Sequence, residues 1–238
     1  MKSSDDIPPE MIADWKRRAA VHAVEWIESG MTVGLGSGST AWFALLRIGE
    51  RLASGEIRDI VGVPTSEVVE AKARRLKIPL CSDDDPPPID LTIDGADEVD
   101  ANLNLIKGGG GALLREKLVA QLSRREVIVV DATKISDTLG HRATLPVEII
   151  SFGWQAQQRF LQDLGARVTL RIGQHDRPFR TDQGNLILDA TFGPIVDPHE
   201  LARRLEVRAG VVGHGLFLNL ATDLVVAGRD GIRHVARS

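Results

Sequence analysis

Acidic side chains and glycines crowd together between residues 94 and 111, in the stretch DGADEVDANLNLIKGGGG. Asp94 and Asp97 come first, directly after the apolar run IDLTI, and Lys107 precedes four consecutive glycines. This composition is unfavourable for a helix or a central strand, because glycine loses much conformational freedom and Asp and Asn favour turns. Paired carboxylates beside a lysine and a flexible main chain can bind a polar ligand and move a proton. Either aspartate alone would also fit a turn-forming residue.

The same stretch contains part of the ligand spacing of a calcium-binding loop. From Asp100 the pattern D-x-N-x-N appears, but the sixth position is Leu105 instead of glycine and the twelfth is Gly111 instead of glutamate. An EF-hand needs both of those residues, so the calcium hypothesis fails. The histidines form no zinc-binding motif, and we expect no metal site. We expect the remaining acidic and amide side chains to face solvent or to form turns: Glu98, Asp100, Asn102 and Asn104.

Glu116 follows the glycines in the helical pattern GALLREKLVAQL. At about 100° per residue it falls on an apolar face of that helix, between Leu113 and Val119. Burial raises the pKa of a carboxyl group, and a carboxylate poised nearer neutrality is a suitable general base. Two alternatives remain open from the residues alone. Glu116 could form an ion pair with a nearby Lys or Arg, and Lys107 could be a solvated loop lysine.

The stretch GLGSGST, from Gly34 to Thr40, ends an apolar strand pattern and opens a helical one. Glycine amides and a helix N-terminus favour an anion, and Ser37, Ser39 and Thr40 add hydroxyls, which suits one small phosphate. A dinucleotide site would need an acidic residue at the end of the next strand, which instead ends GVPTS. The alternative is a glycine-rich turn with a Ser/Thr helix cap.

The elements that position these groups alternate between strand and helix over the first 139 residues. Strands are expected in MTVGLG, IRDIVGV, KIPLC, IDLTID and EVIVVD, with helices before and between them. This order predicts an α/β fold with a Rossmann-like parallel sheet. Ligands of such sheets bind at the carboxyl ends of the strands, where GLGSGST and Asp94 fall.

The pattern changes after Leu139 to strand, helix, two strands, helix and strand, closing with VVGHGLF. This order matches a smaller ferredoxin-like α+β arrangement. Two last strands, TDLVVAG and IRHVAR, are expected to return to the first sheet. We therefore predict a Rossmann-like catalytic domain of residues 1–139 plus 214–238. The inserted small domain, residues 140–213, is expected to serve oligomerisation or to act as a lid.

Charge and apolar runs exclude several classes of protein. The net charge of −4 gives no basic surface for nucleic acid. The chain has no run of about 18 apolar residues, so we expect no contact with a membrane. The N-terminal residues lack the apolar region of a signal peptide, and Cys81 is the only cysteine. These observations predict a cytoplasmic protein.

Taken together, four motifs resemble one family, ribose-5-phosphate isomerase type A. They are GSGST, DGAD (94–97), KGGGGALLREK (107–117) and DATK (131–134). The resemblance implies an aldose–ketose isomerase that interconverts D-ribose 5-phosphate and D-ribulose 5-phosphate through an enediolate, without a cofactor, in the non-oxidative pentose phosphate pathway. It further implies a homodimer or homotetramer with a sugar phosphate as its only partner class.

The same resemblance assigns roles to particular residues. Glu116 matches the general base, Asp94 and Asp97 match carboxylates for ring opening or hydroxyl handling, and Lys107 matches the lysine near the substrate oxygens. Lys16 is a further phosphate candidate. The implied substrate-binding positions are Ser37, Gly38, Ser39, Thr40, Asp94, Gly95, Ala96, Asp97, Lys107, Gly108, Gly109, Gly110 and Lys134.

Proton abstraction next to a carbonyl needs a positioned base and donors at the forming oxyanion, which Glu116 and Lys107 with the glycine amides would supply. Three other classes of function fit these residues less well. A sugar-phosphate-sensing module would need a DNA-binding segment and no buried base. An amino-sugar phosphate deaminase or a CoA transferase is another enzyme on a similar fold, but the deaminase needs an acid/base histidine that the sequence does not place. A dehydrogenase would need an acidic residue at the end of the second strand, and this sequence lacks it.

Overall fold

The computed structural model describes residues 7–82 and 86–237 and contains two compact units. The first unit comprises Met1–Gly95, Leu118–Ile135 and Leu220–Ser238, and the second comprises Ala96–Lys117 and Ser136–Asn219. The limits differ from the predicted domains, because residues 96–117, 136–139 and 214–219 group with the second unit. The extreme N-terminus used in the signal-peptide argument and residues 83–85 of the proline-rich loop lie outside the described residues.

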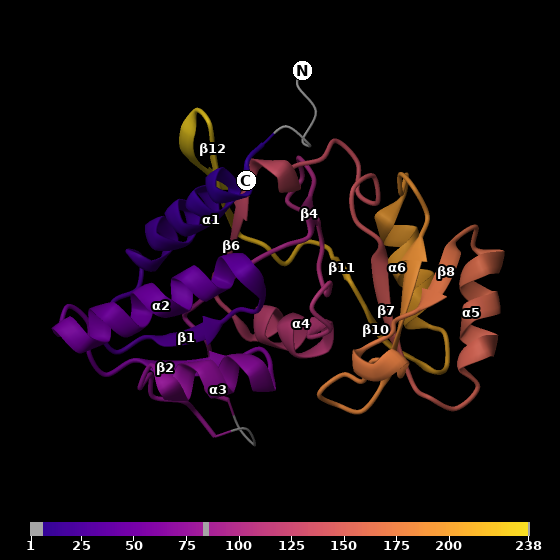
Figure 1. The fold of residues 1–238 in the computed structure, drawn as a ribbon, viewed down its shortest axis with the longest axis horizontal. Coiled ribbons are helices and arrows are strands. Elements are labelled where there is room, and N and C mark those ends of the chain that lie inside the picture. Colours follow the sequence, from indigo (N-terminus) through magenta and orange to yellow (C-terminus); the bar gives the residue numbers. More distant parts are fainter. Residues whose placement is uncertain (1–6, 83–85, 238) are drawn as a thin grey trace. The chain divides into compact units, whose positions relative to one another are not determined.

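The first unit is built on a six-stranded sheet with the order β13-β12-β6-β3-β1-β2. Figure 1 labels four of its strands, β1, β2, β6 and β12. All neighbouring pairs are parallel except the C-terminal hairpin of β12 and β13. This confirms the Rossmann-like sheet and the return of the last strands to it. The strands are β1 (Thr32–Leu35), β2 (Val61–Pro64), β3 (Leu91–Asp94), β6 (Glu126–Asp131), β12 (Asp223–Gly228) and β13 (Gly231–Ala236).

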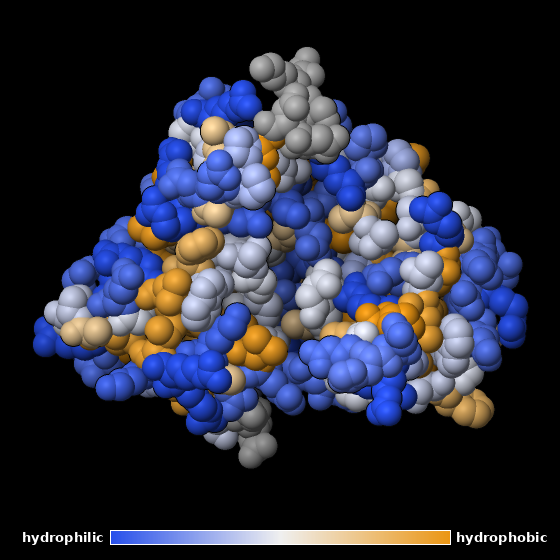
Figure 2. All heavy atoms as spheres, in the orientation of Figure 1, coloured by the Kyte–Doolittle hydropathy of each residue, from blue (hydrophilic) through white to orange (hydrophobic). Residues whose placement is uncertain are grey.

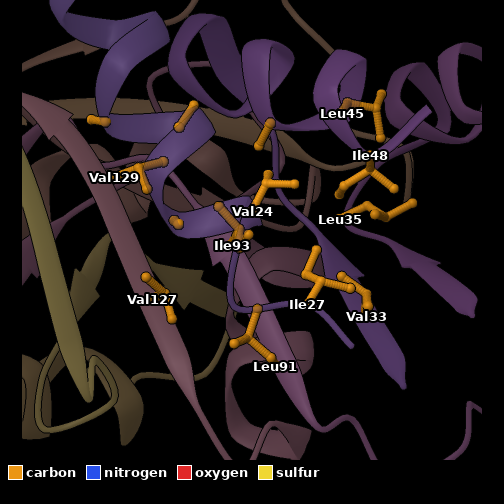
Figure 3. Close-up of a cluster of buried hydrophobic side chains, with 14 of the residues drawn as sticks. Val24, Ile27, Val33, Leu35, Leu45, Ile48, Leu91, Ile93, Val127 and Val129 are labelled. Atoms are coloured by element: carbon orange, nitrogen blue, oxygen red, sulfur yellow. The ribbon is translucent and has the colours of Figure 1, made fainter. Parts of the chain in front are cut away.

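One face of this sheet is covered by α1 (Pro9–Val24) and α2 (Gly38–Ser54). Figure 3 shows their aliphatic side chains over alternate residues of β1, β3 and β6. Each such side chain contributes about 1.5–3 kcal/mol when it is fully buried. The next helix, α3 (Glu67–Arg75), begins at Ser66, whose side chain caps the Val69 N–H. On the other face, Val119 of α4 (Leu113–Leu122) packs near Val63.

The second unit contains a four-stranded antiparallel sheet with the order β10-β7-β9-β8. With two helices between its strands, this is the predicted ferredoxin-like arrangement. Asp197 caps the second helix through the Glu200 N–H, as expected from Pro198 at the first helical position. The elements are β7 (Leu145–Ile149), α5 (Trp154–Asp163), β8 (Arg167–Leu170), β9 (Leu186–Thr191), α6 (Pro198–Glu206) and β10 (Val211–His214).

A three-stranded antiparallel sheet in the second unit was not predicted. It consists of β4 (Glu98–Val99), β5 (Leu105–Ile106) and β11 (Leu216–Phe217), in the order β11-β5-β4. These strands are too short for alternation to be recognised in the sequence. VVGHGLF was expected as one strand, but it is divided at Gly215. The Gly215 N–H donates to the Pro146 carbonyl, and the Gly215 carbonyl accepts from the Lys107 N–H. The chain passes there from one sheet to the other.

The prediction that KIPLC forms a strand is also wrong. It forms a single bridge between Leu80 and Gly62. Pro79 has no N–H to donate, so a continuous ladder cannot form, although its carbonyl still accepts from Gly62. Within the described part of the chain, no helix has the length and apolar character needed to cross a bilayer.

Candidate active site

The first glycine-rich segment, residues 36–40, lies between the end of β1 and the first turn of α2. The Gly36 N–H donates to the Ile93 carbonyl, and the Ser37 N–H donates to Asp94 Oδ1 at 2.9 Å. A β-carbon on Gly36 would lie 2.4 Å from Asp94 Oδ1. Only glycine therefore allows the main chain to approach the end of β3 this closely.

Hydroxyl groups line the same segment. Ser37 Oγ lies 2.8 Å from Thr65 Oγ1 and 3.1 Å from Ser66 Oγ, and Lys16 Nζ donates to Ser39 Oγ at 3.0 Å. Together with the positive end of α2, these groups form an environment suited to an anion. Sequence reasoning missed Thr65 and Ser66. The signal was present, because both follow β2 at the carboxyl edge of the parallel sheet.

A hollow of about 420 Å³ borders this segment between α1 and α2. Its lining is largely apolar, with Ile12, Trp42 and Phe43 beside Lys16 and Ser39. In Figure 2 the hydrophobic atoms visible on the first unit gather over α2. The glycine-rich segment thus borders an apolar surface. Ser39 of the segment and Lys16 of α1 supply the polar groups of this hollow.

Asp94 ends β3 and is 1% exposed. Its Oδ1 accepts from the Ser37 N–H and from the Gly95 N–H at 2.7 Å. Lys134 ends a short 3-10 helix (Ala132–Lys134) directly after β6, and Asp131 caps that turn through the Thr133 N–H. Because β1, β3 and β6 are parallel, their following residues share one edge of the sheet. The first unit therefore brings the segment, Asp94 and Lys134 to the same edge.

The second unit contains a buried ion pair. Lys107 is 2% exposed and Glu116 is 6% exposed, and Lys107 Nζ lies 3.1 Å from Glu116 Oε1. Lys107 follows β5, and Glu116 lies in the first turn of α4. The expected buried Glu116 is confirmed, and so is its alternative as one member of an ion pair. A solvated Lys107 is excluded. Buried charges persist only where they are paired, so the pair places a carboxylate and an ammonium together away from water.

The second glycine-rich segment, residues 107–111, connects these two charges. The Gly109 N–H donates to Asp97 Oδ2 at 2.8 Å, and a β-carbon on Gly109 would lie 2.9 Å from Asp97 Oδ1. Gly108 has a φ of 98° and lies against Leu113. Asp97 thus fixes the main chain of this segment, which leads from Lys107 toward the start of α4.

An aromatic ring lies beside Lys107 of this pair and also beside a second lysine. The Phe217 ring centre lies 5.4 Å from Lys107 Nζ and 5.0 Å from Lys117 Nζ. Lys117 donates to the His214 carbonyl at 2.7 Å, and burial lowers the pKa of Lys117 to about 8. Burial, together with Lys117, lowers the pKa of His214 to about 3, so this imidazole is neutral near pH 7. The sequence could not reveal these contacts, because they join Lys107 and Lys117 to β10 and β11, which lie far along the chain.

Glu98 corrects one expectation about the acidic stretch. It is 0% exposed and accepts from the N–H groups of Gly140, Arg142 and Ala143 at 2.9–3.1 Å. The reason is that Glu98 lies in β4, which was not predicted. Asp100 does form the expected turn, because its Oδ1 accepts from the Asn102 and Asn104 N–H groups.

The predicted site residues divide between the units. Each unit brings its own set together, and the two sets are consecutive in the chain at Gly95 and Ala96. In residues 7–82 and 86–237, no three His, Cys, Asp or Glu side chains converge to hold a metal ion. The first unit contains Ser37, Gly38, Ser39, Thr40, Asp94, Gly95 and Lys134. The second contains Ala96, Asp97, Lys107, Gly108, Gly109, Gly110 and Glu116.

Comparison with known proteins identifies relatives along almost the entire chain. The family model described as ribose 5-phosphate isomerase A (phosphoriboisomerase A) matches residues 61–231. The ribose-5-phosphate isomerase A of Chloroflexus aurantiacus is 56% identical over 223 residues, covering 94% of this chain and 93% of the relative. That of Desulfatibacillum aliphaticivorans is 54% identical over 220 residues, covering 92% and 96%.

Solved structures agree with these relatives. A D-ribose-5-phosphate isomerase in complex with phospho-erythronic acid superposes with a TM-score of 0.92 at 40% identity, covering 95% of this chain and 99% of that one. The ribose 5-phosphate isomerase from Plasmodium falciparum gives 0.91 at 40% identity, with the same coverage. With a family match over most of its length and relatives more than half identical, the chain belongs to the ribose 5-phosphate isomerase A family.

Proposed function

We propose that this chain carries out the reaction of its family, the aldose–ketose isomerisation between D-ribose 5-phosphate and D-ribulose 5-phosphate. The observation that carries the proposal is the buried pair of Lys107 and Glu116 beside a glycine-rich segment. Isomerisation moves one proton between C1 and C2 through an enediolate, and a second proton between the oxygens on these two carbons. It needs a base at the carbon and positive charge or N–H donors at the oxygen where negative charge develops.

Glu116 is the proposed general base. It removes the proton from one carbon and returns it to the other, and such a base contributes about 10²–10⁴-fold to the rate. Lys107 and the amides of Gly108–Gly110 stabilise the enediolate oxygen. The 3.1 Å contact between Lys107 Nζ and Glu116 Oε1 supports this division of roles, because the ammonium and the base lie within reach of the same two-carbon unit.

The phosphate is assigned to the first glycine-rich segment. Ser37, Ser39 and Thr40 offer hydroxyls, and Gly38 and its neighbours offer amides at the N-terminus of α2. Lys134 adds a full positive charge, and Lys16 does so through its contact with Ser39. Neutral donors predominate in this segment, which suits a dianion that must also be released.

Asp94 and Asp97, with Gly95 and Ala96 between them, are assigned to the sugar hydroxyls. Ring opening requires a proton to move between a hydroxyl and the ring oxygen, and a carboxylate can accept that proton. Asp94 is held rigidly by the Ser37 and Gly95 N–H groups, whereas Asp97 is half-buried and holds Gly109. Asp94 is therefore assigned to orient the sugar hydroxyls. Asp97 is the more accessible of the two carboxylates.

Incubation with ribose 5-phosphate in deuterated water tests this function. We expect ribulose 5-phosphate to form, with solvent deuterium entering the product at the carbon that receives the proton. Unphosphorylated ribose should react far more slowly, because it lacks the group bound by the first segment. Absence of any ketose would disprove the function, and ketose without deuterium would point to a shielded proton or to a hydride shift.

We also propose that the small domain, predicted as residues 140–213, mediates a homodimer or homotetramer. Exposed apolar side chains support this, since Phe152, Val196 and Val207 are 88%, 95% and 75% exposed. Analytical ultracentrifugation of the wild type and of Phe152→Ser tests the idea. A monomeric wild type would contradict it. A cytoplasmic location stays a prediction.

A further inference from the structure

Arg171 contacts the second glycine-rich segment from a distant part of the sequence. It directly follows β8, and its Nη1 donates to the carbonyls of Gly108 at 2.9 Å and Gly109 at 3.0 Å. The side chain is 13% exposed. A mostly buried guanidinium with both N–H groups of one nitrogen on adjacent carbonyls is a specific contact.

Asp189 fixes the other side of the same guanidinium. Arg171 Nε donates to Asp189 Oδ2 at 2.9 Å, and Nη2 contacts Oδ1. Asp189 lies in β9, which pairs with β8, and the Arg171 N–H donates to the Ile187 carbonyl. A two-point contact with a carboxylate fixes the plane of a guanidinium. The direction of the Nη1 N–H groups of Arg171 is therefore fixed as well.

The glycine segment is thus held on both sides. Asp97 accepts from the Gly109 N–H, while Arg171 donates to the Gly108 and Gly109 carbonyls. In contrast, a β-carbon on Gly110 would meet nothing within 4 Å. Packing therefore does little to fix Gly110 itself, and the hydrogen bonds of Gly108 and Gly109 orient the peptide that leads into it.

Peptide geometry gives this contact a chemical consequence. The carbonyl of Gly109 and the N–H of Gly110 belong to one trans peptide and point in opposite directions. Arg171 on that carbonyl therefore turns the Gly110 N–H away from itself, and its charge polarises the peptide toward a stronger donor. Within the described chain, the Gly110 N–H makes no hydrogen bond to protein.

We propose that Arg171, oriented by Asp189, is a positioning residue that directs the Gly110 N–H at the oxygen on which negative charge develops. This inference rests on the proposed isomerisation. Arg171 itself acts through the main chain. Its loss is expected to reduce the rate of the chemical step more than the binding of the phosphate, which the first glycine-rich segment provides.

Arg171→Met, Arg171→Lys and Asp189→Asn test the proposal, with Arg180→Met as the matched control. Arg180 Nη1 also donates to a glycine carbonyl, that of Gly184, but at the turn between β8 and β9. We expect Arg171→Met to lower kcat by about 10–100-fold, because a misplacement of about 1 Å can cost about 100-fold. KM should change little, Arg171→Lys should be intermediate, and Arg180→Met should match the wild type.

Hydrogen exchange supplies a readout that does not depend on activity. Amide exchange in residues 107–111 should accelerate at least about tenfold in Arg171→Met and less in Asp189→Asn, and it should be unchanged in Arg180→Met. Equal exchange and equal kcat in Arg171→Met and Arg180→Met would overturn the proposal. So would a loss that appears only in KM.

The two hypotheses fail in different ways. A wild type without isomerase activity would disprove the proposed function, whereas the exchange experiment would still report whether Arg171 holds the segment. Should Arg171→Met not fold, Asp189→Asn keeps the guanidinium and removes only the charge that orients it. Its kcat must then fall at least about threefold with unchanged melting temperature, and a wild-type kcat would overturn the inference.

Discussion

The two glycine-rich segments of this protein use the same residue for different purposes. In the first, residues 36–40, glycine lets the main chain lie against the end of a neighbouring strand, and the groups around it are mainly neutral hydroxyls and amides. In the second, residues 107–111, the chain is tied by the carboxylate of Asp97 and lies between two buried charges, Lys107 and Glu116.

The difference matches the two tasks of an isomerase. A phosphate is already charged, so amides at a helix N-terminus can bind it, and a phosphate bound at the exposed Ser39, as proposed, would be free to depart. Moving a proton from carbon creates charge during the reaction, and preorganised charges away from water stabilise it best. Damage to the second segment should therefore reduce kcat, and damage to the first should raise KM.

Glu116→Gln should have the largest effect. The amide keeps the shape of the side chain but cannot accept the proton, so kcat should fall by about 10²–10⁴-fold while binding of a phospho-sugar acid stays measurable. Steady-state kinetics and calorimetry give the two quantities. A kcat close to that of the wild type would remove Glu116 from its role.

Glu148→Gln is the control for the loss of a buried carboxylate. Glu148 is 0% exposed and accepts from Thr181 Oγ1 and Asn185 Nδ2, so it resembles Glu116 in burial. We expect this variant to lose stability and to retain kcat. If both variants lose kcat equally, buried charge as such, and not the base, would explain the result.

Substitutions by alanine distinguish how the two segments are held. Gly111 has a φ of 87°, and its β-carbon would lie 2.4 Å from Phe179, whereas Gly38 has a φ of 94° with open space around it. Gly111→Ala should lower the free energy of unfolding by about 2–5 kcal/mol, from backbone strain and overpacking together. Gly38→Ala should cost only the strain, about 1–2 kcal/mol.

Gly110→Ala serves as the reference for both, because its β-carbon would meet no atom within 4 Å. We expect its free energy of unfolding to stay within about 0.5 kcal/mol of the wild type. Urea unfolding measures all three variants. If Gly38→Ala were as destabilising as Gly111→Ala, tertiary contacts would not be what sets the second segment apart.

Lys134→Ala tests the binding side of the comparison. Removing this charge should raise KM for ribose 5-phosphate by roughly tenfold, equivalent to about 1.4 kcal/mol, with little change in kcat. The increase should shrink at high salt, because an exposed attraction is screened. Arg229→Ala, which removes an exposed charge in the turn between β12 and β13, is the control. A defect confined to kcat would contradict the phosphate role.

The sequence allowed the parallel sheet to be predicted because its signals are local. Apolar runs such as EVIVVD alternate with helical patterns, and the carboxyl-edge rule then places GLGSGST and Asp94 together. The buried position of Glu116 was predictable for the same reason, since a helix has a fixed angular spacing. The family assignment followed from four motifs in order.

What could not be predicted depends on contacts between distant residues. Strands as short as β4 and β5 have no periodicity, so the burial of Glu98 was missed. KIPLC looks like a strand by composition, but Pro79 limits it to one bridge. The partner of Glu116 was left open between several basic residues, because only the fold brings Lys107 to it. Arg171 has no motif at all, and its contacts arise from the pairing of β8 with β9.

The ion pair of Arg125 and Asp223 offers a last comparison with the buried pair of Lys107 and Glu116. Arg125 and Asp223 lie at the amino-terminal ends of β6 and β12 in the first unit. Both guanidinium contacts are 2.8 Å long, and Arg125 is 41% exposed. Burial acts to raise the pKa of Asp223, but hydrogen bonds from Arg125, Thr222 and His234 prevail and lower this pKa from 3.8 to about 2. A carboxyl whose folded pKa lies below its unfolded pKa stabilises the fold above that unfolded value.

The stabilisation from Asp223 should therefore be complete above about pH 5 and disappear as the pH falls from about 4 to 2. We expect Asp223→Asn to lower the free energy of unfolding by roughly 1–2 kcal/mol at pH 7, after allowance for the exposed guanidinium, and by progressively less toward pH 2. Asp230→Asn, at an exposed position in the turn between β12 and β13, should show no such trend. Urea unfolding across this pH range measures both, and kcat at pH 7 should be unchanged. A loss of kcat in Asp223→Asn would mean that this ion pair reaches the chemistry, and the contrast with Lys107 and Glu116 would no longer hold.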